Sequence, residues 1–182
     1  MHKVLVVIDM QNDFLTGSLK NSEHERVINE VVNVINNEKY DEVFLTRDTH
    51  DDKYLNTQER KKLPVIHTQI NEWGWQIEDS VMSAINDNFD NTNVHFINKP
   101  TFGSKDLQAI FEKLEKKYVS EGLQIDFCGV CTGICVISNA IPAKMFAPEA
   151  NIRVLEKACA CVTPDSHKTA IEAMKTCQID IV

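Results

Sequence analysis

The chain has 182 residues, of which 43% are hydrophobic, and its formal net charge is −8 at pH 7. This composition allows a sizeable core, and no apolar run approaches the ~20 residues that span a membrane. The negative charge argues against nucleic acid and anionic membranes as partners, although a small anionic ligand is compatible with it. We therefore expect a single domain over residues 1–182, located in the cytoplasm because no targeting segment precedes the first predicted strand.

Predicted strands and helices alternate along the chain. Residues 3–9 form a continuous apolar, β-branched run, which is typical of a parallel strand buried on both faces. A helix is predicted over residues 22–35, with Ser22 as a candidate N-cap and Glu25 completing a capping box. A strand follows at 42–47, whereas residues 48–90 show no strong period. The later elements are a strand at 94–99, a helix at 106–116, a strand at 123–128, a helix at 132–145 that Thr132 caps, a strand at 152–155, a helix at 164–176 that Thr163 caps, and a strand at 178–182.

This alternation predicts a parallel sheet with helices on both faces. Ligands bind such folds at the carboxyl ends of the strands. Taken alone, Asp9 could be a turn residue and Lys99 a solvated strand end. The polar side chains that end or follow the predicted strands should nevertheless gather along this edge; they are Asp9, Asp48, His50, Lys99 and Cys135.

Cys135 follows the apolar run that ends before Gly129. A helix that starts at Thr132 places this cysteine in the first helical turn, where unpaired N–H groups and the helix dipole stabilise a thiolate. We therefore expect a lowered thiol pKa, and we expect backbone N–H groups near Cys131 and Cys135 to form an oxyanion hole. The alternatives are a small core side chain or an iron–sulfur or zinc cluster with Cys128 and Cys131, although no further Cys-x-x-Cys pair follows.

A carboxylate, an ammonium group and a thiol in one site make a nucleophilic set. Asp9 can accept the thiol proton and later deliver it to a leaving amine. Lys99 balances the charge and lowers the thiol pKa. The chemistry that fits these three residues is acyl transfer to water through a thioester on Cys135.

Three motifs in this sequence resemble those of the isochorismatase-like cysteine hydrolases. They are DMQNDF from Asp9, KP from Lys99 and GVCTGICV from Gly129, and their order and spacing match over essentially the whole chain. Gly133 departs from the pattern, because the family usually has an acidic residue there, which puts the efficiency of the site in doubt. The resemblance implies a three-layer α/β/α fold with a six-stranded Rossmann-like sheet, hydrolysis of a small amide, a triad of Asp9, Lys99 and Cys135, and a cis peptide at Val130–Cys131.

A further pattern is similar to the metal ligands of nicotinamidases within this family. Asp48-x-His50 is followed by His67, and Glu59 falls where some members supply a fourth ligand. Two imidazoles and one or two carboxylates suit zinc, manganese or iron. The resemblance implies a divalent metal that takes the pyridine nitrogen while the carboxamide meets the cysteine. Many relatives keep Asp-x-His without using a metal, so the alternative stays open.

The remaining aromatic and imidazole side chains give weaker signals. Phe14 resembles the family position that flanks the substrate ring, although core packing would also explain it. His95 lies inside a predicted strand and should be packed. We expect His2, His24 and His167 at surface or cap positions.

The sequence thus favours an amidohydrolase that converts nicotinamide to nicotinate and ammonia, as a cytoplasmic homo-oligomer in NAD salvage. One alternative is a cysteine amidohydrolase for another small amide of the N-carbamoyl type. Another is a non-catalytic nucleotide-binding or regulatory module. The first turn argues against this last alternative, because it offers no glycine-rich phosphate loop.

Overall fold

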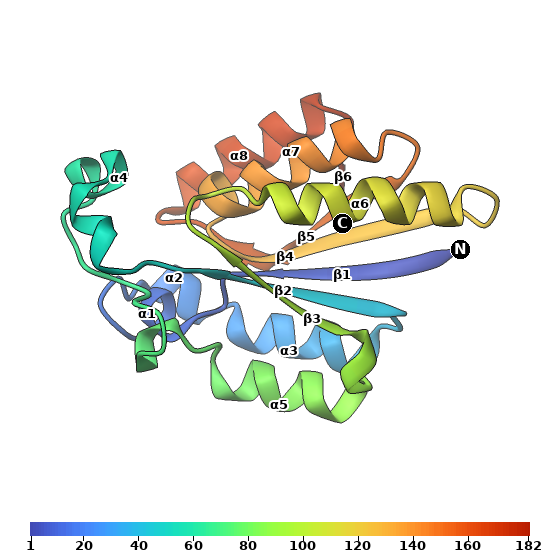
Figure 1. Ribbon diagram of the computed structural model, residues 1–182. Helices are drawn as coiled ribbons and strands as arrows, with labels where there is room; N and C mark the ends of the chain where they lie inside the picture. Colours follow the sequence, from blue (N-terminus) through green and yellow to red (C-terminus); the bar gives the residue numbers. More distant parts are fainter.

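The computed structural model describes residues 1–182 as one six-stranded sheet between two helical layers (Figure 1). The strands pair in parallel in the order β3-β2-β1-β4-β5-β6. In Figure 1, α2, α3 and α5 lie below the sheet, and α6, α7 and α8 lie above it. The predicted three-layer α/β/α fold is therefore confirmed. The strands are β1 (His2–Ile8), β2 (Glu42–Asp48), β3 (Val94–Lys99), β4 (Leu123–Val130), β5 (Asn151–Ala160) and β6 (Asp180–Ile181).

Helices of very different length connect these strands. None of them is long and apolar enough to cross a membrane. The α-helices are α1 (Asn12–Leu15), α2 (Ser22–Glu25), α3 (Ile28–Asn37), α4 (Gln58–Lys62), α5 (Asp79–Asn88), α6 (Lys105–Tyr118), α7 (Ile137–Phe146) and α8 (Pro164–Thr176). The 3₁₀ turns are η1 (Asp52–Asn56), η2 (Trp73–Trp75) and η3 (Asn91–Asn93), and η4 (Thr132–Val136) is a π-helical turn.

The first predicted helix differs from the structure. Residues 22–35 do not form one helix but belong to α2 and α3, which are separated at residues 26–27. Ser22 is the first helical residue and not the cap. The side chain of Asn21 accepts a hydrogen bond from the backbone N–H of Glu23 at 2.8 Å and is the N-cap of α2. The prediction was wrong because Asn21 and Ser22 are both good capping residues, and only one can hold that position.

Two further elements were not delimited correctly from the sequence. Helix α5 lies inside the segment in which no regular element was predicted, and it buries only Val81, Ala84 and Ile85 among polar residues. Its short apolar stripe gives a weak helical period. Strand β5 extends to residue 160, five residues beyond the prediction, because its half-exposed and exposed middle interrupts the apolar pattern.

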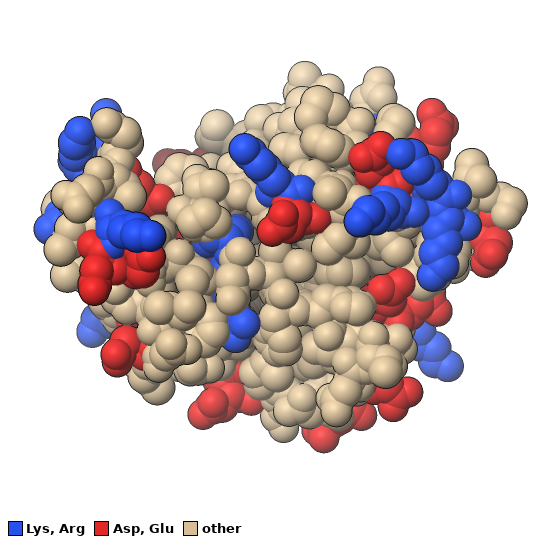
Figure 2. Space-filling view, viewed as in Figure 1, with Lys and Arg blue, Asp and Glu red and all other residues tan.

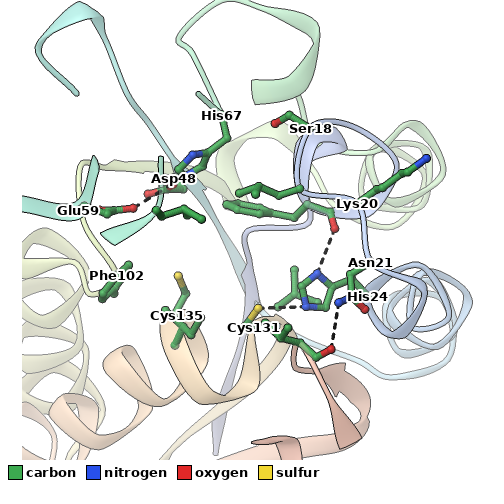
Figure 3. Close-up of a pocket in the computed structure, with 16 residues that line it drawn as sticks. Ser18, Lys20, Asn21, His24, Asp48, Glu59, His67, Phe102, Cys131 and Cys135 are labelled. Atoms are coloured by element: carbon green, nitrogen blue, oxygen red, sulfur yellow. Dashed lines mark hydrogen bonds and ion pairs between the residues drawn. The ribbon is translucent and has the colours of Figure 1, made fainter. Parts of the chain in front are cut away.

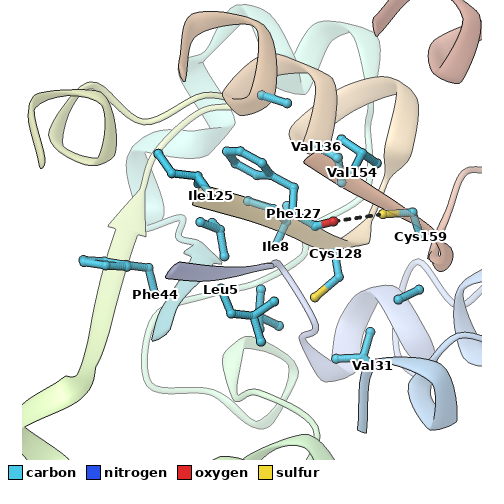
Figure 4. Close-up of a cluster of buried hydrophobic side chains, with 14 of the residues drawn as sticks. Leu5, Ile8, Val31, Phe44, Ile125, Phe127, Cys128, Val136, Val154 and Cys159 are labelled. Carbon is cyan, nitrogen blue, oxygen red and sulfur yellow. Dashed lines mark hydrogen bonds between the residues drawn. The ribbon is translucent and has the colours of Figure 1, made fainter. Parts of the chain in front are cut away.

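The core lies on both faces of the central strands. All eight residues of β4 are buried, and so are the last five residues of β1. Figure 4 shows side chains of these strands packed with Val136 of η4 and Val154 of β5. Cys128 and Cys159 lie within this core and are fully buried, so these two cysteines are structural side chains.

Gly129 determines how closely β1 and β4 approach at their carboxyl ends. It pairs with Ile8 in the parallel register and has a φ of +110°, a value that favours glycine. A Cβ at this position would overlap the carbonyl oxygen of Ile8. The absence of a side chain therefore brings the residue after β1, Asp9, close to the turn that carries Cys135.

Charged side chains of both signs occur over the surface. In Figure 2, basic side chains gather around α4 and near the C-terminal end of α6, in each place beside acidic ones. The ion pair between Lys116 and Glu112 at 2.5 Å is one such neighbouring pair on α6. Exposed pairs of this kind contribute little to stability, so the fold depends on its core.

Candidate active site

A cavity of about 450 Å³ opens at the carboxyl edge of the sheet. Figure 3 shows that its walls come from the loop after β1, from the end of β2, from α4 and from the turn after β4. This is the edge at which the sequence predicted a ligand site. The predicted site residues that line the cavity are Phe14, Asp48, Glu59, His67, Cys131 and Cys135.

Asp9, Lys99 and Cys135 meet at the floor of this edge. The Nζ atom of Lys99 lies 2.7 Å from Oδ2 of Asp9 and 3.5 Å from Sγ of Cys135. It also donates to the backbone carbonyl of Thr101 at 3.2 Å. The side chains of Asp9 and Lys99 have no solvent exposure. The structure thus brings together the three side chains that the sequence grouped, which lie at or after the ends of three different strands.

Thr46 positions Asp9 and was not recognised from the sequence. Its hydroxyl donates to Oδ1 of Asp9 at 2.6 Å and accepts the backbone N–H of Asp9 at 3.2 Å. These bonds hold Asp9 in a left-handed conformation with a φ of +48°. The signal in the sequence was a single hydroxyl residue directly after the apolar residues of β2. In the structure this hydroxyl is fully buried, and such a group needs a polar partner.

The charge state of Cys135 differs from the prediction. Burial raises the pKa of this thiol well above its ordinary value, and the negative charge of Asp9 raises it further, which outweighs the opposing effect of Lys99. Burial also raises the pKa of Asp9, against the lowering effect of Lys99. Burial lowers the pKa of Lys99, but the nearby acidic groups more than reverse this. Cys135 is therefore a thiol in the substrate-free protein, with Nζ of Lys99 3.5 Å from its sulfur.

The turn that carries Cys135 is tightly closed. The carbonyl of Cys131 accepts the backbone N–H groups of Ile134 and Val136, both at 3.0 Å. The Val130–Cys131 peptide is cis, as the resemblance implied. Thr132 is not the predicted cap; its hydroxyl lies 2.8 Å from Nδ1 of His167. The role of the backbone N–H groups of Cys131 and Cys135 as an oxyanion hole stays a prediction.

Asn139 connects this turn to the segment after Lys99, and it was not recognised from the sequence. Its side chain is fully buried in α7. It donates to the carbonyls of Cys135 at 2.8 Å and Phe102 at 3.1 Å, and it accepts the N–H of Ser104 at 2.9 Å. Since Phe102 lies three residues after Lys99, Asn139 fixes the cysteine turn relative to the lysine.

The four predicted metal ligands form one cluster. Their ligand atoms all lie within 4.8 Å of one another. Oδ2 of Asp48 is 3.0 Å from Nε2 of His50 and 3.4 Å from Nε2 of His67, and Oε1 of Glu59 is 3.7 and 3.8 Å from the same two nitrogens. Glu59 comes from α4, whereas the other three lie at or beside the sheet edge.

The donor set fits a metal ion. Nε2 of His50 and Oδ1 of Asp48 are buried and have no hydrogen-bond partner in the protein. Nδ1 of His67 hydrogen-bonds to the carbonyl of Val65 at 2.9 Å, which leaves its Nε2 lone pair directed at the cluster. Two imidazoles and two carboxylates are a common set for zinc, manganese or iron.

Backbone contacts preorganise this cluster. Gln11 is buried and bonds both ways with Asp48: its Oε1 accepts the Asp48 N–H at 2.7 Å, and its Nε2 donates to the Asp48 carbonyl at 2.9 Å. Oδ1 of Asp48 is also 3.6 Å from Nζ of Lys99. Burial raises the pKa of Asp48, but the neighbouring imidazoles of His50 and His67 and the charge of Lys99 lower it below its ordinary range. Asp48 therefore links the metal-ligand cluster to Lys99.

Asp13 connects two walls of the cavity. Its Oδ2 accepts the backbone N–H of Thr68, next to His67, at 2.7 Å, and its Oδ1 accepts that of Ser18 at 3.1 Å. The ring of Phe14 lies 5.8 Å from the ring of His67. Phe14 therefore faces the cavity beside the metal-ligand cluster, where the sequence expected a ring-binding side chain.

Three of the remaining histidines depart from simple surface positions. His24 is 3% exposed, so its predicted surface or cap position was wrong. Its Nδ1 hydrogen-bonds to the carbonyl of Phe14 at 3.1 Å, and its Nε2 lies 3.0 Å from Sγ of Cys131. His2 stacks on Tyr118 with ring centroids 3.8 Å apart. His95 packs as expected, with its ring 4.5 Å from that of Phe44.

Comparisons with known proteins agree with this architecture. The isochorismatase domain model matches residues 3–182. A protein of Bacillus subtilis (strain 168), described as the uncharacterized isochorismatase family protein PncA, is 27% identical over 179 residues, which cover 94% of this chain and 93% of that protein.

Solved structures share the fold over the full chain. The nicotinamidase/pyrazinamidase PncA from Bacillus subtilis has a TM-score of 0.81 at 22% identity, with 100% of this chain and 100% of that chain covered. The pyrazinamidase of Pyrococcus horikoshii, solved in complex with zinc, has a TM-score of 0.77 at 24% identity, with 100% of this chain and 99% of that chain covered. The pyrazinamidase/nicotinamidase of Streptococcus mutans UA159 has a TM-score of 0.81 at 21% identity, with 99% of each chain covered.

Proposed function

The chain belongs to the isochorismatase family, and we propose that it is an amidohydrolase that cleaves nicotinamide to nicotinate and ammonia through a thioester on Cys135. One observation carries this proposal. Asp9, Lys99 and Cys135 lie at the edge of the same 450 Å³ cavity as the cluster of Asp48, His50, Glu59 and His67. A nucleophilic set beside a metal-ligand set suits a small amide attached to a nitrogen heterocycle.

The metal-ligand cluster would orient the ring. A divalent zinc, manganese or iron ion held by Asp48, His50, His67 and Glu59 would supply an electrophilic position for a pyridine nitrogen. Phe14 lines the cavity, with its ring 5.8 Å from that of His67, and offers an apolar face to the ring of the substrate. A ring held at both positions keeps its carboxamide near Cys135 and lowers the entropic barrier to attack.

Asp9 moves the proton in the acylation step. The thiol of Cys135 gives its proton to Asp9, whose raised pKa suits a general base, and the sulfur attacks the carboxamide carbon. Backbone N–H groups of Cys131 and Cys135 hold the developing oxyanion. Asp9 then returns the proton to the amide nitrogen, and ammonia leaves. Lys99 stays protonated throughout and compensates the negative charge that passes between sulfur and carboxylate.

Hydrolysis of the thioester uses the same groups in reverse. Asp9 takes a proton from a water molecule, the oxygen attacks the thioester carbon, and the thiol of Cys135 is restored as nicotinate leaves. The nicotinamidases and pyrazinamidases with this fold support the substrate class. A cytoplasmic place in NAD salvage and homo-oligomerisation stay predictions from the sequence.

The test is ammonia release from nicotinamide, measured for the protein before and after chelation and for Cys135→Ala. We expect turnover that Cys135→Ala abolishes and that chelation strongly reduces. Cys177→Ala is the matched control, because it removes an exposed thiol far from the chemistry. A chelated protein that is inactive on nicotinamide but active on an N-carbamoyl substrate would select the other amidohydrolase. Nucleotide binding without any amidase activity would contradict an enzymatic role.

A further inference from the structure

A second pair of cysteines lies beside the proposed nucleophile. Cys131 lines the cavity, whereas Cys161 follows β5 and is 3% exposed. Their strands are neighbours, and the preceding residues Val130 and Ala160 are partners in the parallel register. Neighbouring strands lie about 4.8 Å apart, and disulfides join Cα atoms about 4.4–6.8 Å apart. Cys131 and Cys161, both free thiols, directly follow these paired residues, so the register places them side by side at the ends of the two strands.

Each thiol of this pair has a group that prepares it for redox chemistry. His24 uses Nδ1 on the Phe14 carbonyl, so its Nε2, 3.0 Å from Sγ of Cys131, is an acceptor for that thiol proton (Figure 3). The neighbouring Cys131 thiol, with polar groups of Ser166, Gly133 and Val162, lowers the pKa of Cys161 to about 5 against the effect of burial. Cys161 and burial in turn raise the pKa of Cys131. A thiolate thus stands next to a thiol that has its own base.

Gly133 makes room for this arrangement. A Cβ at residue 133 would lie 3.2 Å from Sγ of Cys161, closer than ordinary contact. The glycine therefore lets the sulfur approach the cysteine turn. Asn21 closes the other side, where its Nδ2 donates to the carbonyl of Val162 at 3.0 Å.

We infer that Cys131 and Cys161 are a modification site at which a hydroperoxide forms a reversible disulfide. Hydrogen peroxide small enough to enter the cavity meets Cys131, whose proton passes to Nε2 of His24. The sulfur attacks one peroxide oxygen, the O–O bond breaks, and the departing hydroxide takes that proton from His24 and leaves as water, so Cys131 becomes a sulfenic acid. The Cys161 thiolate then attacks that sulfur and displaces hydroxide, which takes a proton from solvent and leaves as water. In total, one thiol, one thiolate, one peroxide and one solvent proton give one disulfide and two waters.

The disulfide should stop turnover, and this part of the inference rests on the proposed function. Cys131 opens the turn that carries Cys135, and its carbonyl accepts two of the hydrogen bonds that close that turn. Pulling its side chain from His24 toward β5 would shift this turn and the cavity wall. Cys135 is less prone to the first oxidation, because it is buried, whereas Cys131 is half-buried and lines the cavity beside Nε2 of His24.

The test treats the reduced protein with hydrogen peroxide and maps tryptic peptides without reduction. Residues 118–144 contain Cys128, Cys131 and Cys135, and residues 158–168 contain Cys159 and Cys161, so fragment spectra must locate the linked cysteine in each peptide. We expect a cross-link between these peptides together with a loss of amidase activity that dithiothreitol reverses. Cys161→Ala should keep full basal activity but form no cross-link. Cys159→Ala, the matched control two residues away, should form it as the parent does.

Fragment spectra of the parent cross-link distinguish Cys159 from Cys161, because Ala160 lies between them, so the result does not depend on either variant folding. His24→Gln should slow cross-linking by roughly a hundredfold if His24 is the base. A cross-link that persists in Cys161→Ala, or a bond from Cys131 to Cys135, would overturn the inference. Irreversible oxidation of Cys135 alone would do the same. The cross-link is detected by peptide mass and not by turnover. The inference can therefore fail while the protein is active on nicotinamide, and it can hold if the proposed function fails.

Discussion

At the scale of single residues, burial decides the chemistry of the proposed triad. Cys135, Asp9 and Lys99 are all buried, and each has a pKa above its ordinary value. Before the reaction the site therefore holds a Cys135 thiol beside the ion pair of Asp9 and Lys99. The thiolate forms only during the attack on the substrate. The sequence indicated the helix terminus and Lys99, which both lower the thiol pKa. It did not indicate burial, which raises that pKa and is a property of the assembled fold.

The first prediction concerns thiol alkylation. In the substrate-free protein at neutral pH, iodoacetamide should modify exposed Cys177 faster than Cys135, because only the thiolate reacts and the pKa of Cys135 is raised. The rate at Cys135 should rise with pH beyond the ordinary thiol pKa of about 8.5. Peptide mass spectrometry over time measures both sites. Faster labelling of Cys135 than of Cys177 at pH 7 would show that the thiolate predominates at rest.

The second prediction concerns Asp9→Asn. The amide keeps the shape and can still bond Thr46, but it cannot accept the thiol proton, so kcat should fall by about 10²–10⁴-fold with little change in KM. The variant also leaves the buried ammonium of Lys99 with only the more distant Asp48, so its free energy of unfolding should fall. Kinetics and urea unfolding measure the two effects. Thr46→Val, which keeps the carboxylate, should lose much less activity, and equal losses would contradict the role of Asp9 as base.

At the scale of elements, the close pairing of β1 and β4 positions the site. Gly129→Ala should reduce the free energy of unfolding by at least ~2 kcal/mol, because the new Cβ overlaps the Ile8 carbonyl and φ is +110°. Gly122→Ala is the matched control: φ is also positive there, at +83°, but the nearest atom to the new Cβ is 3.7 Å away. Urea unfolding should show a loss near 1 kcal/mol for this control. Similar losses in both variants would mean that the overlap at Gly129 is relieved cheaply.

Helix α4 carries Glu59, the one proposed metal ligand that lies away from the sheet. Figure 1 shows α4 projecting from the body of the molecule, and the Glu59 side chain is 16% exposed, against 2% for His67. His67→Ala should therefore abolish stoichiometric zinc binding, while Glu59→Ala should keep it with an affinity lowered by at least roughly tenfold. Elemental analysis and competition with a chelator measure these outcomes. Equal loss in the two variants would show that α4 contributes as much as the sheet edge.

At the scale of the whole molecule, metal binding should couple to stability. The cluster needs ligands from β2, α4 and the segment before α5 to be assembled, so the ion binds the folded state and not the unfolded chain. Zinc at 100 times its dissociation constant adds about 2.7 kcal/mol, which raises the Tm by roughly 5–10 °C for a chain of this size. Calorimetry with and without zinc tests this. His67→Ala should show no rise, and a rise in that variant would indicate binding elsewhere.

The sequence predicted the fold and the neighbourhood of the site because both follow from simple patterns. Apolar runs identified the strands, and the carboxyl-edge rule grouped residues such as Asp9 and Lys99 that are 90 positions apart. It could not identify Thr46 and Asn139, because their partners, the carboxylate of Asp9 and the carbonyl of Cys135, lie near them only in the tertiary fold. It also misjudged His24, because an imidazole among polar residues gives no signal of burial. The catalytic and metal-binding roles stay predictions that the experiments above decide.

One carboxylate joins two walls of the cavity. It contacts neither the cysteine nor the metal-ligand cluster. Asp13 ties the segment after Phe14 to the segment after His67, and Gly74 packs against it where no larger residue would fit. The distance between the rings of Phe14 and His67 therefore depends on contacts of Asp13, which lies outside the substrate-facing set. Selectivity between flat heterocycles and bulkier amides can then diverge between related proteins through changes around Asp13, while every residue that faces the substrate stays the same.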